Sequence, residues 1–280
     1  MTTRRDFVRT AGTAIAAAAV PHWSWRTMAH ERLGRIGVQL YTVRAAMAKD
    51  FEGTLAKVAG VGFQEVEFAG YFGRSPAAVR EALHRNGLTS PSTHLPFEGL
   101  AGDWDRLLED CKTIGHDYAL IAWTPQEARQ SLDDWKRIAE RFNRAGEAAR
   151  RMGLTFAYHN HDFEFEPLQG RIPFDLLLES TDPELVRIEM DLYWITYGGA
   201  DPLTYFTRYP GRFPLVHVKD LKRGAEHPMV DVGAGDIDWK AIFRKHAQAG
   251  IRHYFVEHDE PADAFGSIAA SYRYLKGLEF

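Results

Sequence analysis

The sequence predicts an α/β fold, a single (β/α)8 TIM barrel, and two features of the chain predict it. From Arg35 onward, short apolar runs alternate with longer stretches whose apolar residues recur at three and four positions. The alternation repeats eight times without a Pro- or Ser-rich linker, which predicts parallel strands covered by helices in one domain, residues 30–280. A doubly wound open sheet is the alternative, because eight such units can also lie flat.

The first four units run from residue 35 to residue 123. The runs "RIGVQLYTV", "FQEVEFAG", "LTSPSTHLP" and "DYALIAW" are the expected strands at 35–43, 63–70, 88–96 and 117–123. Most of them are apolar throughout, as strands buried on both faces are. The stretches between them, at 51–62, 75–87 and 103–115, have apolar residues at helical spacing and end at a glycine suited to a helix C-cap.

The last four units follow the same pattern. The expected strands are 154–161, 185–194, 213–221 and 253–261, and the expected helices are 132–153, 173–181, 201–211, 238–250 and 263–278. Several of these helices begin with Asp or Pro, which are suited to the first positions of a helix.

The composition favours a globular protein that acts on a small molecule. Of the 280 residues, 45% are hydrophobic and 26% are charged, which is ordinary for a packed domain. The formal net charge is −4, and no run of five like charges occurs, so a nucleic-acid surface is not expected. No sequence signal indicates an oligomeric state.

The N-terminal segment, residues 1–29, is expected to be a twin-arginine (Tat) signal peptide. Arg4 and Arg5 are followed by Phe7 and by the mildly apolar stretch 11–20. A stretch of about ten residues is too short to span a ~30 Å hydrocarbon core, so no stable membrane anchor is expected. This prediction makes the Tat machinery a partner and places the protein in the periplasm or outside the cell; an amphipathic helix is the alternative.

Four consecutive late strands end in residues that can bind a metal ion. His159, Asp191, His217 and Glu257 stand near the carboxyl ends of strands five to eight, where the active sites of such barrels lie. One divalent cation can neutralise and coordinate all four, whereas unpaired carboxylates in a low-dielectric pocket cost several kcal/mol each. The mixture of imidazole and carboxylate suits Mn, Zn, Co or Fe better than Ca or Mg.

The motifs in order resemble the sugar phosphate isomerase/epimerase family of xylose isomerase-like TIM barrels. The resemblance runs through "IGVQLYTVR", "YHNHDFEF", "MDLYW", "GGADP", "HVKD", "VGAGDIDW" and "FVEHDEP". It implies one divalent metal, with Asp191, His217 and Glu257 matching the family's ligands on strands six, seven and eight. Epimerase-type members place a glutamate on strand five, where this chain has His159. His161, one step further towards the mouth, is then the candidate for the proton role.

Further strand-end residues are candidates for contacts with substrate. Glu67, His94, Asn160 and Trp194 are predicted to bind substrate, although Glu67 and His94 are equally compatible with buried hydrogen bonding, and many family members have a histidine at the position of Trp194. Lys219 either holds a substrate oxygen or pairs with a carboxylate, and we predict the first. Glu164 and Glu166, in contrast, are expected to face solvent.

The predicted function is that of a metal-dependent sugar isomerase or epimerase. The metal would stabilise the enediolate formed from a ketose or oxidised sugar, and Glu257 with His161 or His159 would move the proton. The histidine on strand five keeps a lyase or hydratase acting on a 3-keto-glycoside or keto-inositol as an alternative. A non-catalytic sugar-binding protein is the remaining alternative.

Overall fold

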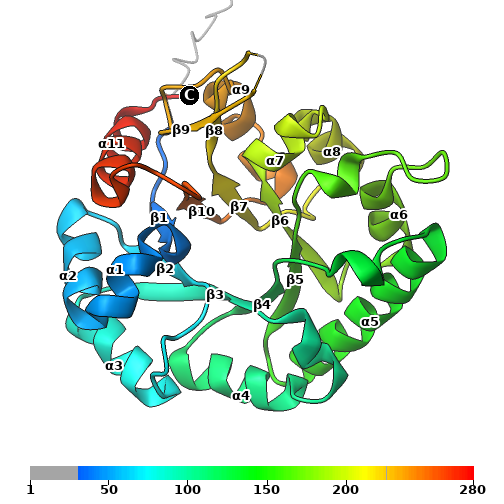
Figure 1. The fold of residues 1–280 in the computed structure, drawn as a ribbon, viewed down its shortest axis with the longest axis horizontal. Coiled ribbons are helices and arrows are strands. Elements are labelled where there is room, and N and C mark those ends of the chain that lie inside the picture. The colour runs from blue at the N-terminus through cyan, green and yellow to red at the C-terminus, as the bar shows by residue number, and fades with distance from the viewer. Residues whose placement is uncertain (1–30, 225) are drawn as a thin grey trace, which may run out of the picture. The chain divides into compact units, whose positions relative to one another are not determined.

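The computed structural model of the 280-residue chain describes residues 31–224 and 226–280. The signal peptide predicted at 1–29 lies outside the described residues. Residues Glu31–Phe280 form one compact unit, in which helices surround a closed barrel of parallel strands (Figure 1). The predicted (β/α)8 barrel is therefore confirmed, and the open sheet is wrong.

The barrel closes in the order β1-β10-β7-β6-β5-β4-β3-β2, and all neighbouring pairs are parallel. Its strands are β1 (Gly37–Gln39), β2 (Glu65–Phe68), β3 (Thr89–Leu95), β4 (Tyr118–Ile121), β5 (Thr155–His159), β6 (Val186–Asp191), β7 (Leu215–Val218) and β10 (His253–Val256). A two-stranded antiparallel hairpin, β8 (Asp220–Leu221) with β9 (Met229–Val230), follows β7.

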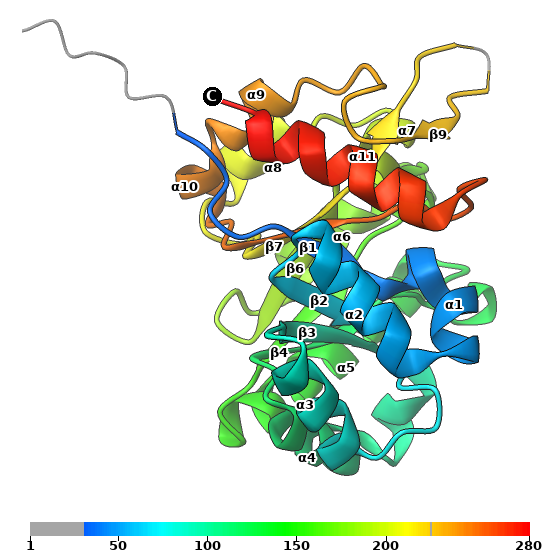
Figure 2. The same ribbon diagram turned by 90° about the vertical axis from the view of Figure 1, so that its left-hand side faces the viewer.

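The helices pack outside the barrel and connect its strands (Figure 2). They are α1 (Arg44–Lys49), α2 (Phe51–Val61), α3 (Pro76–Arg85), α4 (Trp104–Ile114), α5 (Leu132–Arg151), α6 (Pro173–Ser180), α7 (Leu192–Tyr197), α8 (Pro202–Arg208), α9 (Trp239–Phe243), α10 (His246–Ala249) and α11 (Ala264–Gly277). Among the described residues, no helix is both long enough and apolar enough to cross a membrane.

Helix α5 shows how sequence produces these elements. Ser131 caps its first turn by accepting a hydrogen bond from the backbone N–H of Asp134. Trp135, Ile138 and Phe142 follow at spacings of three and four, and all three are buried against the barrel.

Several predicted boundaries differ from the structure. The expected strand at 185–194 ends at Asp191, because the Asp191 carboxylate accepts hydrogen bonds from the backbone N–H groups of Tyr193 and Trp194 and so caps α7. The expected helix at 238–250 is divided into α9 and α10.

The waist of the barrel is apolar. Tyr118, Leu120, Ala157, Leu215 and Phe255 form a separate buried cluster. Gly37 makes room for it, since a Cβ atom there would lie 2.5 Å from Cδ1 of Phe255. The interior is therefore packed rather than open, and the ionisable groups lie at the two ends.

Candidate metal and catalytic site

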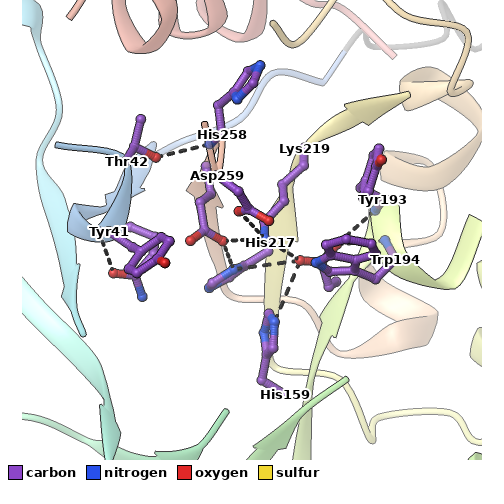
Figure 3. Close-up of polar contacts among 12 residues, drawn as sticks. Tyr41, Thr42, His159, Tyr193, Trp194, His217, Lys219, His258 and Asp259 are labelled. Atoms are coloured by element: carbon purple, nitrogen blue, oxygen red, sulfur yellow. Dashed lines mark hydrogen bonds and ion pairs between the residues drawn. The ribbon is translucent and has the colours of Figure 1, made fainter. Parts of the chain in front are cut away.

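Ionisable side chains from six strands meet above the waist, at the carboxyl ends of the strands. His94 comes from β3, and His159 comes from β5. The others are Glu67 from β2, Glu189 and Asp191 from β6, His217 from β7, Lys219 just after β7, and Glu257 and Asp259 just after β10. Figure 3 shows His159, His217, Lys219 and Asp259 converging beside Trp194.

The layer nearer the mouth is built around Lys219. Its Nζ lies 3.1 Å from Oδ2 of Asp191, 2.7 Å from Oε2 of Glu257 and 2.8 Å from Oδ1 of Asp259. Nδ1 of His217 lies 2.7 Å from the same Glu257 oxygen. The structure thus brings together Asp191, His217 and Glu257, the ligands that the family resemblance implies.

A deeper layer is built around Glu67 and Glu189. Nε2 of His217 lies 2.6 Å from Oε2 of Glu67 and 3.1 Å from Oε2 of Glu189. Nε2 of His94 lies 3.1 Å and 2.8 Å from the same two oxygens. Gln39 also donates to Glu67 at 2.8 Å. In this structure Glu67 is fully buried and binds protein side chains, whereas His94 reaches the cavity.

His159 joins the two layers. Its Nδ1 lies 3.1 Å from Oε2 of Glu189, and its Nε2 lies 3.6 Å from Oδ2 of Asp191. By distance it groups with His94, Glu189 and His217, whose ligand atoms lie within 4.8 Å of one another. Asp191, His217 and Glu257 form a second group within the same limit.

Burial and charge shift the pKa values of these groups in opposite directions. Burial raises the pKa of Asp191 to about 6. Burial also favours a neutral His94, but Glu67 and Glu189 outweigh it and raise the pKa of His94 to about 9. Burial and the nearby Lys219 ammonium lower the pKa of His161 to about 3, so its imidazole is neutral at pH 7.

The donor set fits a divalent cation. Five carboxylates meet here, and Lys219 is the permanent cation paired with three of them. Oδ2 of Asp191 is buried and accepts no hydrogen bond, although His159, His217 and Lys219 all face it. A buried, unsatisfied carboxylate oxygen is costly, and a cation held by imidazole and carboxylate groups satisfies it.

A cavity of about 920 Å³ opens above the cluster. His161, Trp194 and Lys219 line it together with His94 and Glu257. Nδ1 of His161 is buried and has no hydrogen-bond partner, and the His161 and Trp194 rings lie 5.8 Å apart. The cavity therefore presents a neutral imidazole beside the ammonium group of Lys219.

Asn160 lies away from the cavity lining. Its side chain is fully buried, and its Oδ1 accepts a hydrogen bond of 3.1 Å from the backbone N–H of Asp191. This bond ties the end of β5 to the end of β6 and fixes the two chain segments that carry His159 and Asp191.

Glu164 is buried rather than exposed, so its predicted solvent exposure is wrong, whereas Glu166 is exposed as predicted. Oε2 of Glu164 accepts a hydrogen bond of 2.9 Å from the backbone N–H of His161, and Oε1 of Glu164 accepts one from the hydroxyl of Tyr158. The turn after β5 folds this carboxylate inward, where it positions His161. Burial raises the pKa of Glu164 to about 8.

No role was assigned from the sequence to Glu189, Asp259 or Gln39, which all join the cluster. Period-two spacing places Glu189 on the same strand face as Asp191, but Asp259 follows Glu257 beyond the end of β10, where that pattern no longer applies.

The chain is similar to known proteins in sequence and in fold. A sequence profile of the xylose isomerase-like TIM barrel family matches residues 55–278. An inosose dehydratase of Geobacillus kaustophilus is 26% identical over 262 residues, which cover 79% of this chain and 83% of that protein. A crystal structure of a sugar phosphate isomerase/epimerase from Parabacteroides distasonis is 26% identical with a TM-score of 0.78, and the match covers 87% of this chain and 98% of that one.

A more distant structural neighbour contains a metal ion. It is the IOLI protein with a bound zinc atom, which is 13% identical with a TM-score of 0.69, and the match covers 86% of this chain and 96% of that one. At this identity the likeness concerns the fold alone. Together with the closer matches, it agrees with the family predicted from the strand-end motifs, and the matches indicate an enzyme.

Proposed function

Because the chain belongs to the xylose isomerase-like TIM barrel family, we propose that it is a divalent-metal-dependent lyase that removes water, or another β-substituent, from a keto-sugar or keto-cyclitol. The observation that carries this proposal is the pairing of two unlike groups in one cavity. His161 and Lys219 both line the cavity, where they place an imidazole and an ammonium group. An elimination needs both an acceptor for the α-proton and a donor for the departing oxygen.

The metal would be held by His159, Asp191, His217 and Glu257. The unsatisfied oxygen of Asp191 and the excess of carboxylates over permanent cations support this assignment, and the zinc atom in the distant IOLI neighbour agrees with it. When bound, such a cation stabilises the negative charge that develops on a carbonyl oxygen as the adjacent carbon loses a proton.

The protein's own groups then have distinct tasks. His161 accepts the α-proton, and the backbone contact with Glu164 holds its position. Lys219 donates to the leaving oxygen, while Asp191, Glu257 and Asp259 hold its ammonium group in place. Because Glu257 contacts both His217 and Lys219, we assign it to metal binding rather than to proton transfer.

The name of the relative matched over 262 residues, inosose dehydratase, favours elimination from a keto-cyclitol. Isomerisation or epimerisation is the second candidate, and the solved sugar phosphate isomerase/epimerase that is 26% identical favours it. Both reactions begin with removal of the same proton. Among the described residues that line the cavity there is no arginine, so we propose a substrate without a phosphate group.

The test uses four preparations of the protein, loaded with Mn, Zn, Co or Fe. Each preparation is incubated with inosose and, separately, with unphosphorylated ketoses. Elimination is expected to release water from inosose and to produce an unsaturated ketone or its tautomer, detected by absorbance and by NMR. An isomeric or epimeric sugar formed without loss of water would support the second candidate instead. If neither product forms with any of the four metals, both candidate functions are contradicted.

We also propose that residues 1–29 direct export through the twin-arginine route. The pair Arg4 and Arg5 before the apolar stretch 11–20 supports it. A reporter fused after residue 29 should reach the periplasm, and an Arg4→Lys, Arg5→Lys variant should leave it in the cytoplasm. Equal export of both fusions would contradict this proposal.

A further inference from the structure

The cavity has two unlike halves. The polar half contains the groups of the proposed reaction: His94, His159, His161, Lys219, Glu257 and Asp259. The opposite half is formed at the ends of β2, β3 and β4 by Ala69, Gly70, Leu95, Pro96, Ala122 and Trp123. Those six residues carry no charge.

Trp123 is the most exposed large apolar side chain among the described residues of the barrel, with 49% of its surface exposed. It follows the end of β4 directly and lines the cavity, and among the described residues no aromatic ring packs against it. Tyr41, on the turn after β1, also lines the cavity and is 42% exposed. In the view of Figure 3, Tyr41 and Trp194 lie on opposite sides of His217 and Asp259.

An exposed aromatic face at the wall of a cavity is a surface that a ligand ring can cover. A ligand ring that stacks on such a face removes apolar surface from water, which is favourable. The polar half needs only one sugar-sized ring, yet the cavity of about 920 Å³ lies near the upper end of the roughly 300–1,000 Å³ typical of ligand sites. The space beyond the polar half is therefore large enough for a second ring.

We propose that the apolar half, with Trp123 as its stacking platform, is a subsite for an uncharged ring attached to the sugar. This inference rests on the proposed function only in placing the keto ring in the polar half. The ligand chemistry is a flat, weakly polar ring face, which either an aryl group or a second pyranose provides. The substrate would then be a ring-substituted oxidised sugar rather than a free monocyclic one.

The experiment compares affinities of the metal-loaded protein for methyl and phenyl β-D-glucopyranosides and for cellobiose by calorimetry. These sugars lack the ketone, so binding is measured without turnover. The phenyl glycoside, cellobiose, or both should bind roughly 5- to 10-fold more tightly than the methyl glycoside, as expected for one stacked ring. Preference for the phenyl glycoside alone identifies an aryl substituent, and preference for cellobiose alone identifies a second sugar.

Trp123→Ala should reduce this ratio to near one, and Trp123→Phe should retain part of it. The matched control is Tyr274→Ala, which removes an aromatic ring that is 37% exposed on α11, away from the cavity lining. Unchanged metal content and melting temperature show that the variants are folded. A wild-type ratio near one, no measurable binding of either ring-substituted sugar, or a ratio that survives Trp123→Ala would overturn the subsite.

These outcomes are separate from those of the proposed function. A protein that eliminates water from inosose but binds the three glycosides equally lacks the subsite and keeps the proposed activity. A protein with the Trp123-dependent preference but without elimination from any keto-sugar keeps the subsite and loses the proposed activity.

Discussion

The two ends of the barrel both bury carboxylates, but they neutralise them differently. At the amino end of β2, Glu65 lies 2.9 Å from Nδ1 of His253 and 3.7 Å from the Arg35 guanidinium. At the other end of the same strand, Glu67 shares its neighbours His94 and His217 with Glu189. Glu65 and Glu67 are thus only two positions apart on one strand, yet Glu65 has partners of its own and Glu67 belongs to a crowded cluster.

This difference teaches that burial of charge alone does not identify a functional site. At the amino end, the Glu65 carboxylate has the Arg35 guanidinium and the His253 imidazole beside it, and such a pairing stabilises the fold or is neutral to it. The carboxyl end gathers more carboxylates than permanent cations, which is unfavourable for a structural network and favourable for a site that binds a cation.

The largest expected effect comes from Asp191→Asn. The amide keeps an oxygen to cap α7 at Tyr193 and Trp194, but it removes the negative charge that faces His159 and Lys219. We expect loss of bound metal and a fall in turnover of roughly 10³-fold or more, measured by elemental analysis and by the product assay.

Glu65→Gln is the matched variant at the amino end and should keep the full metal content. If Asp191→Asn also binds metal as tightly as wild type, the two ends do not differ in the way described, and the assignment of Asp191 as a ligand is wrong.

The next largest effect is expected for His161→Gln, which removes the proposed proton acceptor while leaving the ligand set intact. Turnover should fall roughly 10²-fold or more, with metal content close to that of wild type. Measuring both quantities in one preparation separates the proton role from metal binding. Parallel loss of metal and turnover would instead make His161 a ligand.

Glu164 offers a sharper test, because this carboxylate near the mouth is buried and its hydrogen-bond donors, the Tyr158 hydroxyl and the His161 N–H, are neutral. Burial raises its pKa from the usual 4.5 to about 8, so the neutral form is favoured in the folded state. The stability that this preference gives is present below the unfolded pKa and is lost as pH rises towards 8. Glu164→Gln should therefore gain stability relative to wild type between pH 5 and pH 8, on the order of 2 kcal/mol, in urea unfolding. A difference that does not change with pH would contradict the buried, protonated carboxyl.

The smallest effect is expected for Glu65→Gln. The Arg35 side chain is 63% exposed, so it remains solvated when its partner becomes neutral. The free energy of unfolding should fall by about 1 kcal/mol, and turnover should not change. A large loss of turnover would show that the amino end contributes to the reaction.

Much of the fold was predictable because apolar periodicity reports burial directly. All eight expected strands contain a barrel strand, and the helical stretches match the outer helices, although one is divided. Boundaries were less predictable where a side chain changes the backbone path. Asp191 ends a strand and caps a helix at once, and the apolar run 192–194 after it resembles a continuing strand.

The candidate site was predictable as far as strand ends determine position. His159, Asp191, His217 and Glu257 lie together because parallel strands place their carboxyl ends at one edge. The position of Glu164 was not predictable, because a short turn after β5 directs it inward and no periodic pattern describes such a turn. The deep pairing of Glu67 with His217 depends on contacts across the barrel, between residues 150 positions apart.

The apolar waist beneath the cluster also sets how protons reach the site. Leu120, Ala157, Leu215 and Phe255 are fully buried there, so water has no route through the barrel axis. A substrate ring bound over the mouth would then shield the site from bulk water. If His161 accepts the α-proton as proposed, that proton would exchange with bulk water only as fast as the ring leaves. The fraction of deuterium label that a recovered substrate retains therefore measures residence time in the pocket as well as chemistry.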